Sequence, residues 1–183
     1  WDVVPDIMTV AKGIISSYLP MAAAIATKEV ADYFGGEGNA FNGTLTYSGH
    51  PVSTAAALKN IEILENEHMV ENSAEVGAYF KEQMEGFKDD HPIVGDVRGR
   101  GLLLAMELVK DRETKERFPK EAKIGHHLNE SFQKHGLIFR TGGDVLSIGP
   151  PLCITREEVD EIVHALDLSL WELEGELGIA RKQ

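Results

Sequence analysis

The stretch TVAKGIISSYLPMAAAIAT, residues 9–27, decides how the first part of the chain folds. Residues 6–11 and 21–27 are short apolar runs bounded by turn residues, and such runs predict two short buried strands. Between the two runs stands Lys12, whose ammonium is costly to bury among apolar neighbours. Lys12 is therefore either a strand-end lysine with its charged head in water or an amine with a chemical task.

The chemical task that suits Lys12 is Schiff-base formation with a carbonyl compound. That reaction needs an amine that is free of its proton near neutral pH, a state that desolvation favours. Gly13 follows at once and keeps the approach to the amine open. The local residues leave both interpretations of Lys12 open.

Helical patterns follow this strand region. A short helix is predicted over residues 28–34, and a long glycine-rich loop over 35–51. Pro51 is a good first-turn residue, and the helix it begins has apolar positions over most of its circumference, so we expect that helix to be well buried. A second helix, over 69–88, is amphipathic, with one apolar side made by Val76, Tyr79, Phe80, Met84 and Phe87.

The rest of the chain mixes strands and helices. Gly136 is placed to close a helix, and Thr155 and Glu158 have capping-box spacing at the start of another. The predicted elements are two strands around a glycine-rich bend within 91–110, a helix over 120–136, strands over 137–140 and 145–151, and a helix over 155–177 whose core stripe is Val159, Ile162, Val163, Leu166 and Leu170.

The order of these elements predicts an α/β chain in two parts. Residues 1–68 look like the edge of a larger α/β layer, and residues 69–183 like a small α+β domain. The chain opens on Trp1 rather than methionine and runs directly into a predicted strand. We therefore expect an upstream part to be missing.

Composition narrows the possible functions. The net charge is −12, from 18 Lys and Arg against 30 Asp and Glu, which argues against binding to nucleic acid or to an anionic membrane. No apolar run approaches the roughly 18 residues that a membrane span needs. The histidines lack metal-ligand spacing, so no metal site is predicted.

The single cysteine, Cys153, rules out an internal disulfide within these residues. A chain without disulfides suits a reducing compartment, so we expect a cytoplasmic protein. The neighbours of Cys153 are apolar and include no cation, which predicts a packing residue rather than a nucleophile.

The loop NGTLTYSGHP, residues 42–51, is a candidate phosphate site ahead of a helix. It is not a P-loop, because it lacks the terminal Gly-Lys-Ser/Thr, and an ordinary capped turn is the alternative. Its hydroxyl-bearing residues are Thr44, Thr46, Tyr47 and Ser48.

Arg140 stands at the end of an apolar strand beside a glycine turn. A guanidinium in that position can hold a carboxylate through two parallel hydrogen bonds. A structural salt bridge to Asp144 or another acid is an equally good interpretation.

Taken in order, these segments closely resemble the class III pyridoxal-phosphate aminotransferases, nearest to the omega-amino acid or amine:pyruvate enzymes. The resemblance covers essentially the whole chain and implies the C-terminal part of a fold-type-I enzyme. Residues 1–68 then belong to the large cofactor-binding domain, and residues 69–183 form the small C-terminal domain. The blocks that carry the resemblance are PDIMTVAKG with YLPMAAAIA, TYSGHPVSTAAALKNIEIL, VRGRGLLLAMELV and GLIFRTGGDVLSIGPPLCITREEVDEIV.

The resemblance implies roles for three residues. Lys12 matches the lysine that holds pyridoxal 5′-phosphate as an internal aldimine and then moves the proton between substrate and cofactor carbons. Thr46 matches the threonine that binds the cofactor phosphate in the partner subunit's site, which implies a homodimer. Arg140 matches the arginine that binds the carboxylate of the keto acid or amino acid. Ser17 departs from the pattern, because relatives often have glycine there.

The resemblance also implies the reaction: an amino group moves from an amine or omega-amino acid to a keto acid such as pyruvate. Aminomutase, racemase or decarboxylase chemistry on the same scaffold is the alternative. A non-catalytic fragment that keeps only the dimer surface is another. The family's phosphate loop, ring-stacking aromatic residue and ring-nitrogen aspartate would lie upstream, so we do not expect these residues alone to be a competent enzyme.

Overall fold

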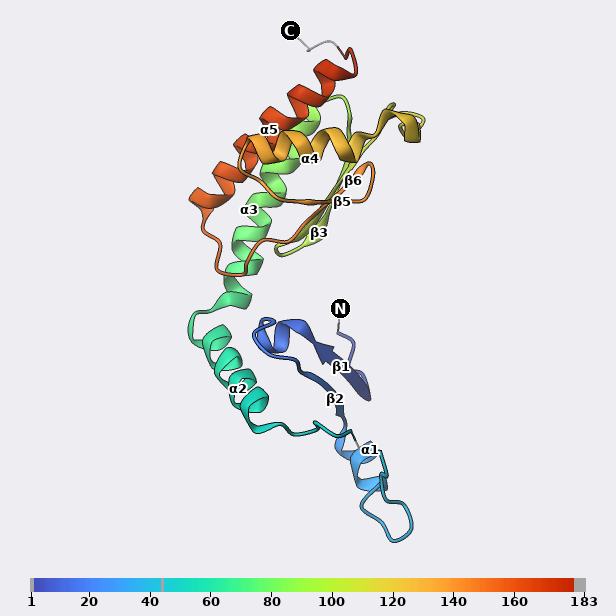
Figure 1. Cartoon of the computed structure of the whole chain (residues 1–183), viewed down its shortest axis with the longest axis vertical. Coiled ribbons are helices and arrows are strands. Elements are labelled where there is room, and N and C mark those ends of the chain that lie inside the picture. Colours follow the sequence, from blue (N-terminus) through green and yellow to red (C-terminus); the bar gives the residue numbers. More distant parts are fainter. Residues whose placement is uncertain (1, 44, 180–183) are drawn as a thin grey trace. The chain divides into compact units, whose positions relative to one another are not determined.

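A computed structural model describes residues 2–43 and 45–179 (Figure 1). The chain divides into two compact units, residues 1–67 and 68–183, and each is described here by itself. Thr44 of the predicted hydroxyl-bearing loop lies outside the described residues.

The first unit begins with two short antiparallel strands, β1 (Ile7–Ala11) and β2 (Ala22–Ala26). A 3₁₀ helix, η1 (Lys12–Ile15), follows β1 directly. Both strands form where the apolar runs predict them, but the prediction that they are buried is wrong, because most of their residues are exposed. Within the described residues β1 and β2 pair only with each other, so no further strand covers their edges.

Two helices complete this unit: α1 (Lys28–Tyr33) and α2 (Pro51–Asn66). Pro51 occupies the first turn of α2, as predicted. The prediction that α2 is well buried is wrong: the side chain of Leu58, for example, is 66% exposed. One side of α2 lies against η1. The buried residues of α2 are Ser53 and Ala57, and Ile15 of η1 is only 1% exposed.

The second unit is a four-stranded antiparallel sheet with helices packed on it (Figure 1). The strands lie in the order β3-β4-β6-β5. Of the predicted strand over 137–140 only Arg140 lies in a strand, because the observed β5 covers Arg140 and Thr141 alone. The elements are α3 (Met69–Asp90), β3 (Val94–Arg100), β4 (Leu103–Leu108), η2 (Lys120–Ala122), α4 (Ile124–Lys134), β5 (Arg140–Thr141), β6 (Val145–Ile148) and α5 (Arg156–Glu176).

The core of the second unit lies between the sheet and helices α3, α4 and α5. The predicted helix stripes are confirmed, since the residues of both stripes lie in the core cluster or pack against it. The predicted capping box is also confirmed: the Glu158 amide donates to Thr155 Oγ1 at 3.2 Å, and the Thr155 amide donates to Glu158 Oε2 at 2.8 Å. Gly136, with φ +79°, closes α4 as predicted.

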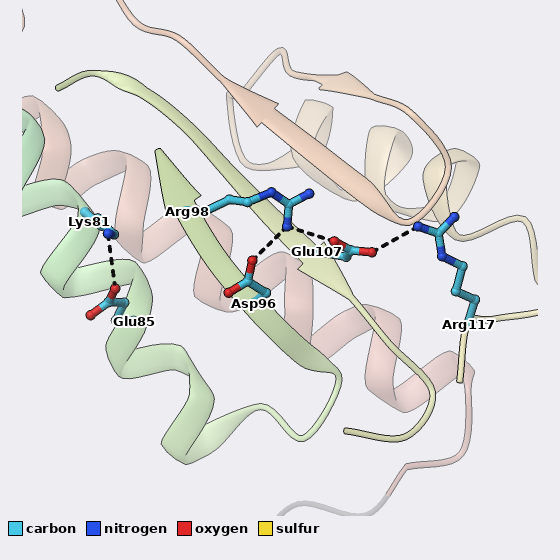
Figure 2. A network of polar contacts seen from close by, with 6 residues as sticks. All are labelled: Lys81, Glu85, Asp96, Arg98, Glu107 and Arg117. Atoms are coloured by element: carbon cyan, nitrogen blue, oxygen red, sulfur yellow. Dashed lines mark hydrogen bonds and ion pairs between the residues drawn. The ribbon is translucent and has the colours of Figure 1, made fainter. Parts of the chain in front are cut away.

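The opposite face of the sheet is polar, as is usual for an antiparallel sheet with one solvated side. Figure 2 shows Arg98 bridging Asp96 and Glu107, each at 2.8 Å, while Arg117 reaches the other oxygen of Glu107 at 3.1 Å. The hydrogen bond from Arg98 holds the pKa of Asp96 below its usual value. These ion pairs link β3 and β4 on the solvent-facing side of the sheet.

The glycine-rich bend between β3 and β4 forms a tight two-residue turn, and it lies against α3. Gly101 has φ +55°, as the first turn residue of a type II′ hairpin requires. A Cβ placed on Gly77 of α3 would lie 2.2 Å from the carbonyl carbon of Gly101. The helix and the turn can approach this closely only because both positions are glycine.

We expect Gly77→Ala to lower the free energy of unfolding by about 1–3 kcal/mol, because its methyl group would overlap backbone that cannot rotate away. The matched control is Gly86 of the same helix, where an added Cβ meets nothing within 4 Å. Gly86→Ala should instead raise the free energy of unfolding by about 0.5–1 kcal/mol. Urea denaturation measures both, and equal effects from the two variants would contradict the steric explanation.

Cys153 is exposed, so the prediction that it is a buried packing residue is wrong. It lies in a turn before α5, where the next residue, Ile154, takes the buried position at 6% exposure. No described helix combines the length and apolar character that crossing a membrane requires.

Candidate functional site

Lys12 is the first residue after β1, and its backbone is in the left-handed region with φ +53°. Residues other than glycine adopt this conformation rarely, and where they do the surrounding structure must hold them in it. The side chain is exposed, and within the part of the chain that the structure describes its amine has no hydrogen-bonding or ionic partner. A Cβ placed on Gly13 meets nothing within 4 Å, so the space beside Lys12 is open, as predicted.

Two further left-handed residues follow in the same turn, Ser16 with φ +46° and Ser17 with φ +61°. The Ser17 amide donates to the Lys12 carbonyl at 3.4 Å, and the Tyr18 amide donates to the Ile15 carbonyl at 3.1 Å. The conformation of Ser17 explains the glycine that the resemblance leads us to expect there, because glycine adopts positive φ without strain. Serine at this position costs about 1 kcal/mol of backbone strain.

Asn60 of α2 contacts this turn directly, and the sequence reasoning did not single it out. Its side-chain Nδ2 donates to the carbonyl oxygens of Gly13 at 3.1 Å and Ile14 at 3.2 Å. Its Oδ1 accepts from the Ser16 hydroxyl at 2.7 Å. The one available signal was an asparagine in the interior of an apolar helix, where asparagine is a poor helix former.

Thr46 lies in an exposed loop beside the N-terminus of α2. It lines a cavity of about 810 Å³ together with residues 20–22, the rest of the segment 45–50, and Ser53 and Thr54 of α2. Residues of the first turn of α2 and several hydroxyl-bearing residues therefore border one cavity, an arrangement that suits an anion.

Lys12 is not among the residues that line the Thr46 cavity. The structure therefore places the two predicted cofactor residues in the same unit but does not bring them to one cavity.

Arg140 is the first residue of β5 and pairs with Ser147 of β6. Its side chain is exposed, and among the described residues it forms no ion pair, so the alternative of a salt bridge to Asp144 is not observed. The turn that follows contains Gly143 with φ +77°, and the Gly142 amide donates to the Val145 carbonyl at 2.8 Å. The guanidinium is therefore free to bind a carboxylate.

Comparison with known proteins shows which family the chain belongs to. The family model described as aminotransferase class III matches residues 1–170. The putrescine–pyruvate aminotransferase of Pseudomonas aeruginosa is 40% identical over 160 residues, which cover 87% of this chain and 34% of that relative.

Two solved structures are similar to the chain. An (S)-enantioselective omega-transaminase from Thermomicrobium roseum has a TM-score of 0.88 at 39% identity, covering 93% of this chain and 38% of that one. An amine transaminase from an uncultivated Pseudomonas species, solved in its PLP-bound form, has a TM-score of 0.88 at 35% identity, covering 94% and 40%.

The chain belongs to the class III aminotransferase family. Its mixed α/β architecture matches a C-terminal portion of fold-type-I transaminases, which confirms the predicted fold class. The chain spans 34% to 39% of the length of the curated relatives that it matches.

Proposed function

We propose that this chain carries the reactive lysine of a pyridoxal-phosphate-dependent aminotransferase that moves an amino group from an amine or omega-amino acid to a keto acid such as pyruvate. The single observation that carries the proposal is Lys12, an unpartnered amine held in a left-handed backbone conformation directly after a strand. Membership of the class III family supports the same assignment.

The residues present fit pyridoxal phosphate. Lys12 offers a primary amine with no competing carboxylate among its described neighbours, as covalent attachment to a carbonyl carbon requires. Thr46 offers a hydroxyl at a cavity that is also bordered by the N-terminal turn of α2, as a phosphate group requires. The PLP-bound relative from Pseudomonas supports this choice of cofactor.

Lys12 and Arg140 then have distinct tasks. Pyridoxal phosphate, when bound, supplies the electron sink. Lys12 would hold the cofactor, and its amine, once an amine substrate has released it, would carry a proton from the substrate carbon to the cofactor carbon. Arg140 binds the carboxylate of the keto acid, which favours transamination over mutase, racemase or decarboxylase chemistry.

We further propose that the protein acts as a homodimer in which Thr46 contributes to the partner subunit's site. Three large apolar residues around the Thr46 loop support this, because Phe41 is 73%, Leu45 77% and Tyr47 83% exposed. Large apolar side chains that stand exposed within one loop are candidates for an interaction surface. Residues 1–68 then belong to the large cofactor-binding domain and residues 69–183 form the small domain.

The proposed compartment is the cytoplasm. A single cysteine, which stands exposed, suits a reducing environment.

The test is to locate the covalent bond. Full-length protein is incubated with pyridoxal phosphate, reduced with borohydride, digested and analysed by mass spectrometry. We expect the reduced cofactor on the peptide that contains Lys12, and its loss in Lys12→Ala. Lys28→Ala is the control, because Lys28 is an exposed lysine of the same unit that pairs with Asp32 at 2.6 Å. Labelling of another lysine in place of Lys12 would overturn the proposal.

Arg140→Ala is expected to raise KM for keto acids by about 10- to 100-fold, since a hydrogen-bonded charged pair contributes about 1.5–3 kcal/mol. KM for a simple amine without a carboxylate should change little. Arg156→Ala is the control, because Arg156 is also exposed but pairs with Glu75 at 2.9 Å. Steady-state kinetics with both substrate classes makes the comparison, and an equal loss on both would show that Arg140 is structural.

A further inference from the structure

The turn that carries Lys12 is strained. Three of the six residues from Lys12 to Ser17 have positive φ without being glycine: Lys12, Ser16 and Ser17. A run of this kind persists only where contacts from elsewhere in the fold hold it. Two of its three backbone hydrogen bonds, from the Ser16 and Ser17 amides, are long at 3.4 Å, and the third, from the Tyr18 amide at 3.1 Å, does not involve the left-handed residues, so these bonds are a weak restraint.

Asn60 supplies the missing restraint. Its amide group donates from Nδ2 to the carbonyls of Gly13 and Ile14 and accepts at Oδ1 from the Ser16 hydroxyl. Only a side-chain amide combines two donated hydrogens with an acceptor in this way, because a carboxylate has no donor and an alkyl chain has neither. All three bonds reach residues within four positions after Lys12.

The position of Asn60 on α2 makes the restraint rigid. Asn60 lies one turn beyond Ala57, which is 4% exposed, and the two share the helix face that covers η1. Ile15, between the two groups of bonded residues, is 1% exposed and anchors the same turn by packing. The backbone that directly follows Lys12 is therefore tied to a regular helix.

We infer that Asn60 is a positioning residue for Lys12: by holding residues 13–16 against α2 it keeps the Lys12 backbone left-handed and so aims its amine. This inference rests on the proposed function of Lys12. If Asn60 served only to stabilise α2, its side chain would not place every one of its recorded hydrogen bonds on a turn 44 to 47 residues away.

The test uses Asn60→Asp and Asn60→Ala in the full-length protein, with Ser16→Ala as a milder variant that removes one of the three bonds. The first readout is hydrogen–deuterium exchange without cofactor. We expect the amides of residues 16–18 to exchange at least tenfold faster in the Asn60 variants, and by a smaller factor in Ser16→Ala. The control is Lys59→Ala, on the neighbouring exposed position that pairs with Glu62 at 2.7 Å, and it should leave these amides unchanged.

The second readout follows Lys12 itself. With pyridoxal phosphate bound, the Asn60 variants should shift the pH at which the visible spectrum changes, and should lower kcat about tenfold with little change in KM. Unchanged exchange of the turn overturns the inference. Exchange that rises equally throughout α2 also overturns it, because the role is then purely structural. A turn that opens without changing the spectral pH profile or kcat overturns it too.

Failure of the proposed function is recognised separately. If borohydride labelling is unaffected by Lys12→Ala, the assignment of Lys12 is wrong whatever the Asn60 variants do. If labelling is lost in Lys12→Ala while the Asn60 variants match the unchanged protein in both readouts, only the positioning role is wrong.

Discussion

Lys12→Ala is expected to lower the rate of transamination by the full-length protein about 10²- to 10⁴-fold through lost proton transfer alone. The alanine variant has no amine to move a proton at the substrate carbon, and no group that can hold the cofactor covalently. Initial rates with an amine donor and pyruvate measure the loss. A small amine added to the solution should restore part of the activity, because the space beside Gly13 is open.

The decisive control is Lys12→Arg. Arginine keeps the positive charge and a similar length, but it does not release its proton near neutral pH. A lysine that only places a charge in water would therefore tolerate arginine, whereas a reactive amine would not. We expect Lys12→Arg to be as inactive as Lys12→Ala, while Lys28→Ala keeps its activity. An active arginine variant would contradict the proposed role.

His91→Ala is expected to lower the free energy of unfolding by about 3–5 kcal/mol, because it leaves a buried carboxylate without its counter-charge. The His91 side chain is fully buried, with Nδ1 3.1 Å from Glu174 Oε2 and Nε2 2.9 Å from Asp167 Oδ1. Both ring nitrogens face carboxyl oxygens, a setting that favours the imidazolium, which has two donors. Glu174 is itself 2% exposed and cannot turn to water.

The charge on His91 gives this contribution a definite pH dependence. Burial alone lowers the pKa of His91, but its hydrogen bonds to Glu174 and Asp167 outweigh burial and raise the pKa above the ordinary 6.5. Because the pKa of the folded state is raised, the stabilisation is complete below about pH 6.5 and is lost as the pH rises through the folded value. The difference between His91→Ala and the unchanged protein should shrink accordingly above neutral pH.

Denaturant unfolding across this pH range tests the prediction. The matched control is His127→Ala, because His127 also pairs with an α5 carboxylate, Glu176 at 2.6 Å, but both side chains are more than a third exposed. An exposed pair contributes about 0–1 kcal/mol. Adding Glu174→Gln to His91→Ala should recover part of the loss by removing the buried charge. Equal costs for the two histidine variants would contradict the explanation.

Local patterns predicted the second unit well. The stripe of α5, its capping box at Thr155 and Glu158, and the glycine that closes α4 all depend on residues within a few positions of one another. The same holds for the hairpin at Gly101, where the turn chemistry is contained in two residues. Predictions of this kind are confirmed because the contacts that they describe form between residues close together in the sequence.

The burial of β1, β2 and α2 was predicted wrongly, because burial depends on contacts that are distant in the sequence. Apolar runs such as 22–26 and an apolar helix such as α2 indicate that a surface can be covered, but not what covers it. Within the described residues, β1 and β2 pair only with each other, and Leu58 stands exposed. Cys153 was misplaced in the same way, since its neighbour Ile154 fills the buried position.

The sequence by itself determined the family, the helix and strand periods, and the residue at which to look for reactivity, Lys12, because motifs and periodicity are properties of neighbouring residues. Only the tertiary structure decided that Lys12 is left-handed, that Asn60 holds its turn, and that His91 meets Glu174 across 83 residues. Those contacts depend on which surfaces meet when the chain closes its long loops, and no local pattern carries that information.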